Sequence, residues 1–521
     1  MPTDTVVNEK LDAGKWQRLS PYAIIYYIVK FISAFVKQGV QTLAPLAAVI
    51  FTAGENRWLI IGLIATGAVI LLIAGAFLSY LKFRFRIAND TFLIQRGVFK
   101  RKRLTLTFDR IQNVAFKEPI YFRPFGLVVM SIESAGSSSE EVGLGGIPRA
   151  LAEDIRTSVL KVRTLSAQKT EETASGDDTI AAGPDSEDAD TIIRQPVSEL
   201  VRYGLSNNNI WVFAGIIAGT LAQIDFDEYA VTADLFDYIE ALIGSSGVAI
   251  AAFSVSLLFI IAFILLGASA LGAVISNYNY HLTRHHGRFH RTKGLFERQE
   301  KSLMESKIQC LQIDQPWTAR LLNRFHLYPK QVGFAKLGQE GGENDMTGAP
   351  RFLIPSVTDT FASSFSKLLY PAFNWESFTL KPINQMYTRK MLTWVFAPIA
   401  VPPAVSLAFV FSPWFLLILL LPLAVSPFVM LRRSKFGYAS NGEYGIIRSG
   451  FLGQKLTVFP FYKAQTVQIS QSPAQRKKQL ANLEIKLAGT SLQIPFMPLA
   501  DAKAWRDRIL LEVESNNSSW M

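Results

Sequence analysis

The sequence predicts a mixed membrane α plus β protein with about six transmembrane helices in three hairpins, each followed by a small antiparallel β-domain. Three observations predict this class: long uncharged apolar runs, basic residues after every second run, and an internal repeat that needs no gap. The composition, 49% hydrophobic and 18% charged, would also suit a soluble protein with a large core. The distribution of the apolar residues therefore decides the class.

Two apolar runs are each long enough to cross a bilayer. Trp58–Leu78 and Ser245–Ser276 contain no charged residue, and about 20 such residues span a hydrocarbon layer of roughly 30 Å. Four weaker runs complete three hairpins, because each lies a short connection from another apolar run and membrane helices tolerate proline. These weaker runs are Gly39–Ala53, Ile210–Ile224, Met391–Phe411 and Trp414–Met430.

The start of the chain predicts an interfacial helix. Lys30 and Lys37 accompany the apolar run Tyr22–Val36, so the lysines would extend to the surface while the tyrosines lie among the lipid headgroups. The polar residues before it contain no cleavable signal peptide. The single Cys310 excludes an intramolecular disulfide.

The charge distribution predicts the orientation of the chain in the membrane. Basic residues follow each hairpin, whereas Asp225–Glu240, inside the second hairpin, is acidic and carries no base. Positively charged segments stay in the cytoplasm, so we expect the β-domains and the N-terminus there. The net charge of +11 then reflects topology and attraction to anionic lipid. Nothing forms a motif that reads nucleic acid, so we expect no nucleic-acid partner.

Three copies of one unit, named copy 1, copy 2 and copy 3, are the strongest signal in the sequence. In each copy a glycine, a glutamine, an arginine and a second glycine recur at identical spacings. A glycine at a hairpin turn supplies a positive φ at low cost, and a short strand follows. These repeated positions are Gly97, Gln112, Arg123 and Gly136 in copy 1, Gly294, Gln309, Arg320 and Gly333 in copy 2, and Gly450, Gln465, Arg476 and Gly489 in copy 3.

Helical patterns follow the β-rich part of a copy. An Ile-Pro pair ends that part in each copy, as in Ile147-Pro148. Apolar residues then recur at helical spacing, and such a face would cover an open end of a sheet. The faces contain Leu151, Ile155, Val159 and Val162 in copy 1 and Ala502, Trp505, Ile509 and Val513 in copy 3.

Two hydrophobic segments followed by the pattern of RGVFKRKRLTLTFDRIQNV in copy 1 resemble the bacterial pleckstrin-homology-like, or membrane-flanked, domain family. Three copies in one chain resemble the YdbT-like membrane proteins. The resemblance implies a small PH-like antiparallel β-barrel closed by a C-terminal helix, and no enzyme activity. Copy 3 departs from the pattern, with Lys463-Ala464 where copy 1 has Arg110-Ile111.

These features predict an ordered series of domains along the chain. An acidic stretch without aromatic residues between copy 1 and the second hairpin cannot bury enough surface to fold. The predicted series is an N-terminal segment with an interfacial helix (1–37), hairpin 1 (38–81), PH-like domain 1 (82–165), an acidic disordered linker (166–195), hairpin 2 with an acidic external loop (196–276), PH-like domain 2 (277–370), a connector (371–390), hairpin 3 (391–431), PH-like domain 3 (432–515) and a tail (516–521).

Basic residues are the candidate ligand-binding groups. Arg123, Arg320 and Arg476 have the planar group that binds phosphate through two hydrogen bonds. A fixed spacing suits a shared fold as well as a shared site, and we favour an ion pair or a turn hydrogen bond internal to the fold. The repeated glutamines favour a bond to the backbone. A second cluster near the membrane consists of Lys100, Arg101, Lys102 and Arg103.

Other chemistry is disfavoured. Four histidines gather in copy 2, but without cysteines nearby they predict no metal site; they are His281, His285, His286 and His290. No catalytic or nucleotide motif is present, and no charge interrupts the firm spans. We therefore expect neither enzyme activity nor a cofactor.

Two hypotheses about function follow. The first is a non-enzymatic inner-membrane scaffold whose cytoplasmic domains bind anionic lipid or a protein partner. That partner would be a second membrane protein of the same family or another copy of the chain. The second is an envelope-protection or export accessory factor, for example against membrane-active peptides, acting through its hairpins.

Overall fold

The computed structural model describes residues 16–33, 57–88, 91–98, 101–108, 111–134, 142–159, 190–206, 215, 246–285, 287–331, 352–373 and 378–516. These residues belong to two compact units. Unit 1 comprises Met1–Asp190 and His290–Ser302, and unit 2 comprises Thr191–Phe289 and Leu303–Met521.

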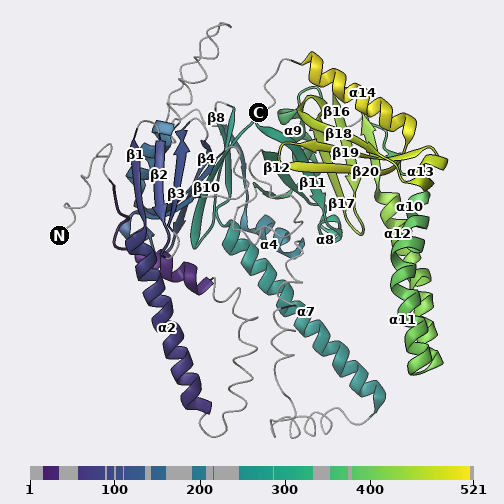
Figure 1. The fold of residues 1–521 in the computed structure, drawn as a ribbon, viewed down its shortest axis with the longest axis horizontal. Coiled ribbons are helices and arrows are strands. Elements are labelled where there is room, and N and C mark those ends of the chain that lie inside the picture. The colour runs from purple at the N-terminus through teal and green to yellow at the C-terminus, as the bar shows by residue number, and fades with distance from the viewer. Residues whose placement is uncertain are drawn as a thin grey trace. The chain divides into compact units, whose positions relative to one another are not determined.

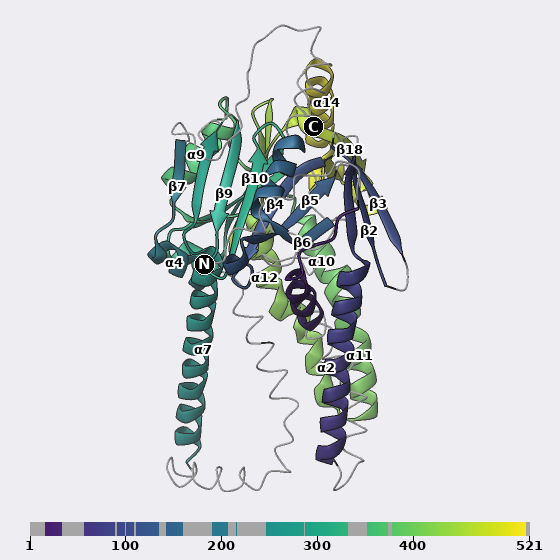
Figure 2. The same ribbon diagram turned by 90° about the vertical axis from the view of Figure 1, so that its left-hand side faces the viewer.

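Unit 1 contains the helix Ala23–Ser33, one long membrane helix and copy 1. Figure 1 shows three strands side by side where α2 ends. Figure 2 shows the helix Ala23–Ser33 in dark purple beside that end of α2. The elements are α2 (Arg57–Lys82), β1 (Arg84–Ala88), β2 (Thr91–Arg96), β3 (Lys102–Thr107), β4 (Ile111–Pro119), the 3-10 helix η3 (Arg123–Phe125), β5 (Leu127–Ser134), β6 (Val142–Pro148) and a helix over 149–159.

Copy 1 folds as two antiparallel half-sheets around one apolar core. β1, β2 and β3 form the first, and β4, β5 and β6 form the second. Alternate residues of β2 point inward, so Phe92 and Ile94 are buried. The helix over 149–159 adds Ile155 and Val159 to the same core, as its periodicity predicts, while Leu151 packs at the margin.

The second half-sheet of copy 1 pairs with the first half of copy 2. Within unit 1, β4 lies antiparallel to β10 (Glu297–Met304), with Glu118 opposite Arg298. β9 (Arg288–Lys293) precedes β10 across the turn at Gly294.

Unit 2 contains most of copy 2, all of copy 3 and two membrane regions. Its elements are β7 (Asp190–Arg194), α4 (Val197–Ser206), α7 (Gly247–Asn277), β8 (His281–His285), β11 (Ile308–Gln315), α8 (Trp317–Leu321), β12 (Phe325–Gln331), β13 (Ile354–Val357), α9 (Asp359–Leu369), β14 (Lys381–Pro382), α10 (Met386–Met391), the π-helix η5 (Leu392–Phe396), α11 (Ala397–Val410), the 3-10 helix η6 (Pro413–Leu420), α12 (Leu421–Lys435), β15 (Gly437–Ser440), β16 (Tyr444–Ser449), β17 (Gln454–Pro460), the 3-10 helix η7 (Phe461–Lys463), β18 (Ala464–Ser470), α13 (Pro473–Lys477), β19 (Leu480–Leu487), β20 (Thr490–Pro498) and α14 (Leu499–Ser515).

The sheets of unit 2 repeat the arrangement of unit 1. One sheet has the strand order β13-β12-β11-β17-β16-β15-β14, so the second half of copy 2 continues into the first half of copy 3. The other is β18-β19-β20, the second half of copy 3. Ile446 and Val458 of copy 3 belong to the copy 2 core, whereas Ile447 and Phe459 belong to the copy 3 core. Successive strand residues face opposite sides, so these strands of copy 3 contribute to two cores.

Three helices in the described residues are long and apolar enough to cross a membrane: Gly62–Lys82, Gly247–Asn277 and Met386–Val410. Each belongs to one of the three predicted hairpins. The predicted runs Gly39–Ala53 and Ile210–Ile224 lie outside the described residues, apart from Gly215. The last run forms η6 and α12, and Pro427 lies inside α12.

The predicted closed barrels are absent from the described residues, where the strands form open antiparallel sheets. The expectation was that each copy would complete its own barrel. Instead, the β4 edge pairs with β10 and the β11 edge pairs with β17. An unpaired strand edge is readily extended by another strand, and the next copy supplies it.

Candidate membrane-interface site

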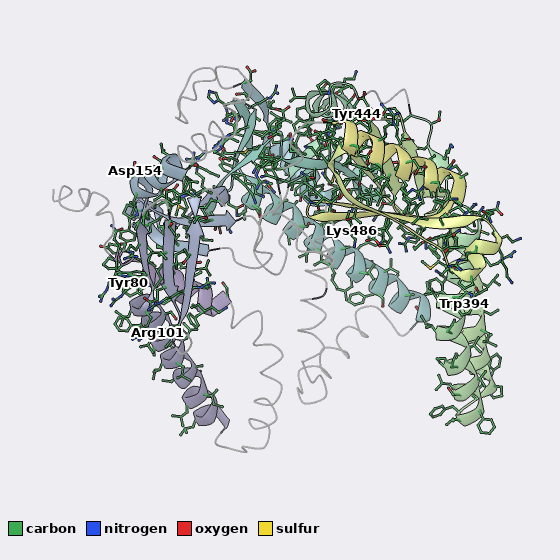
Figure 3. All side chains as sticks on the ribbon, turned by 45° about the horizontal axis from the view of Figure 1, so that its top comes forward. Tyr80, Arg101, Asp154, Trp394, Tyr444 and Lys486 are labelled. Carbon is green, nitrogen blue, oxygen red and sulfur yellow. The ribbon has the colours of Figure 1, made fainter. Side chains whose placement is uncertain are left out.

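The turn between β2 and β3 lies at the membrane end of unit 1. α2 ends at Lys82, β1 begins at Arg84, and Arg84 is opposite Gln95, which is opposite Arg103. Figure 3 shows Arg101 at the end of the unit where Tyr80 of α2 also lies. The register therefore places the basic residues beside the end of the span.

Other cations and aromatic rings lie at the same end. Desolvation lowers the pKa of Lys30, and the neighbouring charge of Arg96 lowers it further. The Lys30 ammonium lies 5.8 Å from the centroid of the Tyr26 ring, and the Arg86 guanidinium lies 5.3 Å from that of Trp16. Cations near one another attract anionic groups such as lipid phosphate.

Exposed apolar side chains accompany the cations in unit 1. Tyr22 stacks on Phe125 with ring centroids 4.1 Å apart, and both remain exposed, as do Ile120 and Phe296. Phe296 belongs to the β9–β10 turn, whose register places it beside the end of β4 at Pro119. Single exposed apolar residues are ordinary, but a group at one end favours contact with a membrane or partner.

Unit 2 has the corresponding feature between copies 2 and 3. The turn after Gly450 exposes 40% of Phe451 and 48% of Leu452, and α8 exposes 51% of Trp317 and 76% of Leu321. Turn and helix are close, because a methyl group on Gly453 would lie 2.8 Å from Cα of Pro316. Phe451 also contacts Phe428 of α12, with ring centroids 5.9 Å apart. That contact places the turn beside α12.

The end of copy 3 is basic instead of apolar. α13 and the residue after it expose Arg476, Lys477 and Lys478. Nearby, a cavity of about 340 Å³ is lined by Lys390 and Val395 of the third membrane region and by residues of the β18-β19-β20 sheet, including Ser470 and Glu484. The cavity therefore combines a cation, a carboxylate and apolar side chains where the span begins.

The structure separates the predicted basic residues into different settings. Arg101, Lys102 and Arg103 are exposed, and Lys100 lies outside the described residues. Arg123 donates a 2.6 Å hydrogen bond from Nη2 to the carbonyl oxygen of Leu295, which is a contact between copies 1 and 2 within unit 1. Arg320 and Arg476 are exposed.

The repeated glycines lie at turns. Gly97, Gly294 and Gly450 have φ values of 112°, 108° and 152°, and each precedes the third strand of its copy. Gly489 has φ 87° in the β19–β20 turn, whereas Gly136 and Gly333 lie outside the described residues.

The glutamines occupy unlike surroundings. Gln309 is buried and donates from Nε2 to the carbonyl oxygen of Lys307 at 3.3 Å, whereas Gln465 is exposed. The side chain of Gln112 is not among those described.

Lys463 has a structural role that the sequence pattern did not indicate. Its buried ammonium donates to the carbonyl oxygens of Ser306 at 2.8 Å and Ile308 at 2.5 Å. Burial lowers the pKa of Lys463 to about 8. The sequence offered one signal, because Lys463 stands where copy 1 has Arg110. It could not indicate the partners of Lys463, since Ser306 and Ile308 in copy 2 are distant in sequence.

The described part of the chain contains no group of three or more His, Cys, Asp or Glu residues placed to hold a metal ion. His281 lies 3.4 Å from the Thr191 hydroxyl, measured from Nε2. His285 lies on β8 and His290 on β9, while His286 lies outside the described residues.

Comparison with known proteins agrees with the repeat. The family described as Bacterial PH domain matches residues 33–163, 241–333 and 394–513, one segment for each copy. The UPF0699 transmembrane protein YdbT of Bacillus subtilis (strain 168) is 23% identical over 481 residues, covering 91% of this chain and 93% of that protein. No solved structure matches the chain. The resemblance inferred from the repeat is confirmed.

Proposed function

This chain belongs to the Bacterial PH domain family, and we propose that it is a non-enzymatic scaffold of the bacterial inner membrane whose PH-like domains bind anionic lipid. Six spans in three hairpins would hold the domains against the cytoplasmic leaflet. The observation that carries this proposal is that basic and apolar side chains gather at the ends of the β-domains next to the membrane helices.

Charge supports the choice of anionic lipid. Arg101 and Arg103 in unit 1 and Arg476 in unit 2 are exposed at such ends. A basic residue near an anionic leaflet contributes about 1 kcal/mol. A few such residues would therefore give a marked preference for anionic over zwitterionic lipid.

Apolar turns support insertion below the headgroups. Phe451 and Leu452 project from a turn that contacts α12, and aromatic residues favour the membrane interface. The domains would then be held at a fixed depth, which distinguishes a membrane-bound scaffold from a domain tethered above the surface.

Depth is tested with spin labels on the full chain in nanodiscs that contain phosphatidylglycerol. A label at Leu452→Cys is expected to be accessible to oxygen and shielded from a water-soluble nickel reagent. Lys486→Cys is the matched control, because the β18–β19 register places it at the opposite end of the sheet from Ser470. Equal, water-like accessibility at both positions would contradict insertion.

Lipid preference is tested with spin-labelled phosphatidylglycerol and phosphatidylcholine. The wild-type chain is expected to immobilise more of the anionic lipid. Arg101→Glu with Arg103→Glu should reduce this preference by more than about tenfold, since each basic residue contributes about 1 kcal/mol and about 1.4 kcal/mol corresponds to a factor of ten. Lys486→Glu should leave it nearly unchanged. A preference that survives the double reversal and high salt would rule out the basic turn as the lipid site.

A further inference from the structure

The two junctions between copies use the same pair of strand edges. In unit 1, the first strand of the second half of copy 1, β4, pairs with the third strand of copy 2, β10. In unit 2, the same strand of copy 2, β11, pairs with the third strand of copy 3, β17. Copy 2 therefore presents one edge to the copy before it and another to the copy after it.

The register of the two junctions is also the same when counted from the repeated glycines. Phe116 is opposite Glu300 in the first junction, and Ile313 is opposite Leu456 in the second. Phe116 and Ile313 each lie nineteen residues after the glycine of their own copy, and Glu300 and Leu456 each lie six residues after theirs. The repeat thus encodes a definite pairing rule.

The two terminal copies leave one edge of each kind available. In the described part of the chain, β3 of copy 1 has β2 as its one neighbouring strand, and β18 of copy 3 has β19 as its one neighbouring strand. β3 is the counterpart of β10 and β17, and β18 is the counterpart of β4 and β11.

We propose that β18 of one chain pairs with β3 of a second copy of the same chain, extending the repeat from molecule to molecule. The rule of the two internal junctions fixes the register, with Ile469 opposite Arg103 and Val467 opposite Thr105. In the first junction Arg123 also donates to the carbonyl oxygen of Leu295, and the residues at the equivalent positions of the proposed junction are Arg476 and Val98. Such a head-to-tail interface closes into a ring or continues as a filament.

Membrane orientation permits this pairing. β3 starts at the membrane end of unit 1, because its first residues are level with Arg84. β18 runs toward the membrane, because Ser470 at its end lines the cavity next to Lys390 and Val395. The two strands therefore run in opposite directions when both chains have the same orientation in one membrane, as an antiparallel ladder requires.

Charge makes the pairing selective and dependent on lipid. β18 (AQTVQIS) carries no charged residue, so it accepts the basic β3, whereas two basic edges would repel each other. The junction would bring Arg101 and Arg103 near Arg476, so anionic lipid must reduce the repulsion. This requirement rests on the proposed lipid binding, whereas the strand pairing rests on the sheet edges alone.

Disulfide trapping in bilayers tests the pairing with the full chain. Two differently tagged chains, one with Thr105→Cys and one with Val467→Cys, are co-expressed and mildly oxidised in phosphatidylglycerol and in phosphatidylcholine nanodiscs large enough for two copies. Cys310 is fully buried and burial raises its pKa to about 11, so it does not react. We expect a covalent dimer of the two tags, several-fold more abundant in phosphatidylglycerol.

The control replaces Val467→Cys with Gln493→Cys, an exposed position on β20 at the other edge of the same three-stranded sheet. Equal dimer yields for the two partners would show random collision and overturn the pairing. The absence of a crosslink in either lipid would overturn it as well. So would a third sample, a single chain that carries both Thr105→Cys and Val467→Cys, if its disulfide formed only within the chain and never between chains. A dimer yield for the Thr105→Cys and Val467→Cys pair that exceeds the control equally in both lipids would overturn the lipid requirement alone. The spin-label measurements separately decide whether lipid binds.

Discussion

Glu199 shows how a single residue attaches the helix α4 to the sheet of copy 2. The Glu199 carboxylate on α4 accepts two hydrogen bonds from Arg324, the residue before β12, at 2.8 and 2.9 Å. It accepts a third from the Ser356 hydroxyl at 2.7 Å. Arg202 is a further partner. Hydrogen bonds from Arg324 are the largest cause that lowers the pKa of Glu199, to about 2.

This network predicts acid-sensitive stability. A carboxylate whose pKa falls on folding stabilises the fold above its unfolded value, 4.5, and the contribution is lost as pH falls toward 2. Glu199→Gln should lower the free energy of unfolding by about 2 kcal/mol at pH 7, a figure reduced for solvent screening.

Thermal unfolding at pH 7 and pH 3 measures this prediction. The Tm difference between wild type and Glu199→Gln should shrink at the lower pH. Glu514→Gln, an exposed position on α14, serves as the control and should leave Tm nearly unchanged. A Tm difference that does not depend on pH would contradict the role of the ionised carboxylate.

At the scale of elements, the two junctions share a register but differ in chemistry. The first is polar: Arg149 contacts Glu118 at 3.3 Å and Glu300 at 3.2 Å, and Arg156 donates to the Ser302 hydroxyl at 3.3 Å. The second packs Leu456 and Val458 of β17 into the copy 2 core. Salt weakens exposed ion pairs but not apolar packing.

Salt should therefore loosen one junction selectively. We expect faster amide exchange in β10 at high salt and little change in β17, measured by hydrogen–deuterium exchange of the full chain. Arg149→Met should mimic the effect of salt on β10 at low salt, whereas Arg506→Met, at an exposed ion pair with Asp507 on α14, should not. Equal salt responses in both strands would contradict the contrast.

For the whole molecule, charge at the span ends predicts an orientation. Basic residues follow each hairpin and acids fill the loop Asp225–Glu240, so from the positive-inside rule we expect the β-domains in the cytoplasm.

Accessibility of single cysteines in cells measures this orientation. Thr232→Cys should react with a membrane-impermeant maleimide in intact spheroplasts, whereas Ser175→Cys should react only after permeabilisation. Cys310, buried in its domain, provides the unreacted background. Labelling of Ser175→Cys in intact spheroplasts would contradict the expected orientation and indicate the opposite one.

The sequence by itself determined the membrane class, the threefold repeat and the turns at Gly97, Gly294 and Gly450. Apolar length and glycine spacing are local properties that can be read along the chain. The tertiary structure decided that half-sheets pair between copies, that Arg123 contacts Leu295 and that Lys463 joins copy 3 to copy 2. Every copy carries the same strand pattern, so the pattern cannot specify which copy supplies the neighbouring strand; that choice depends on contacts between residues distant in the chain.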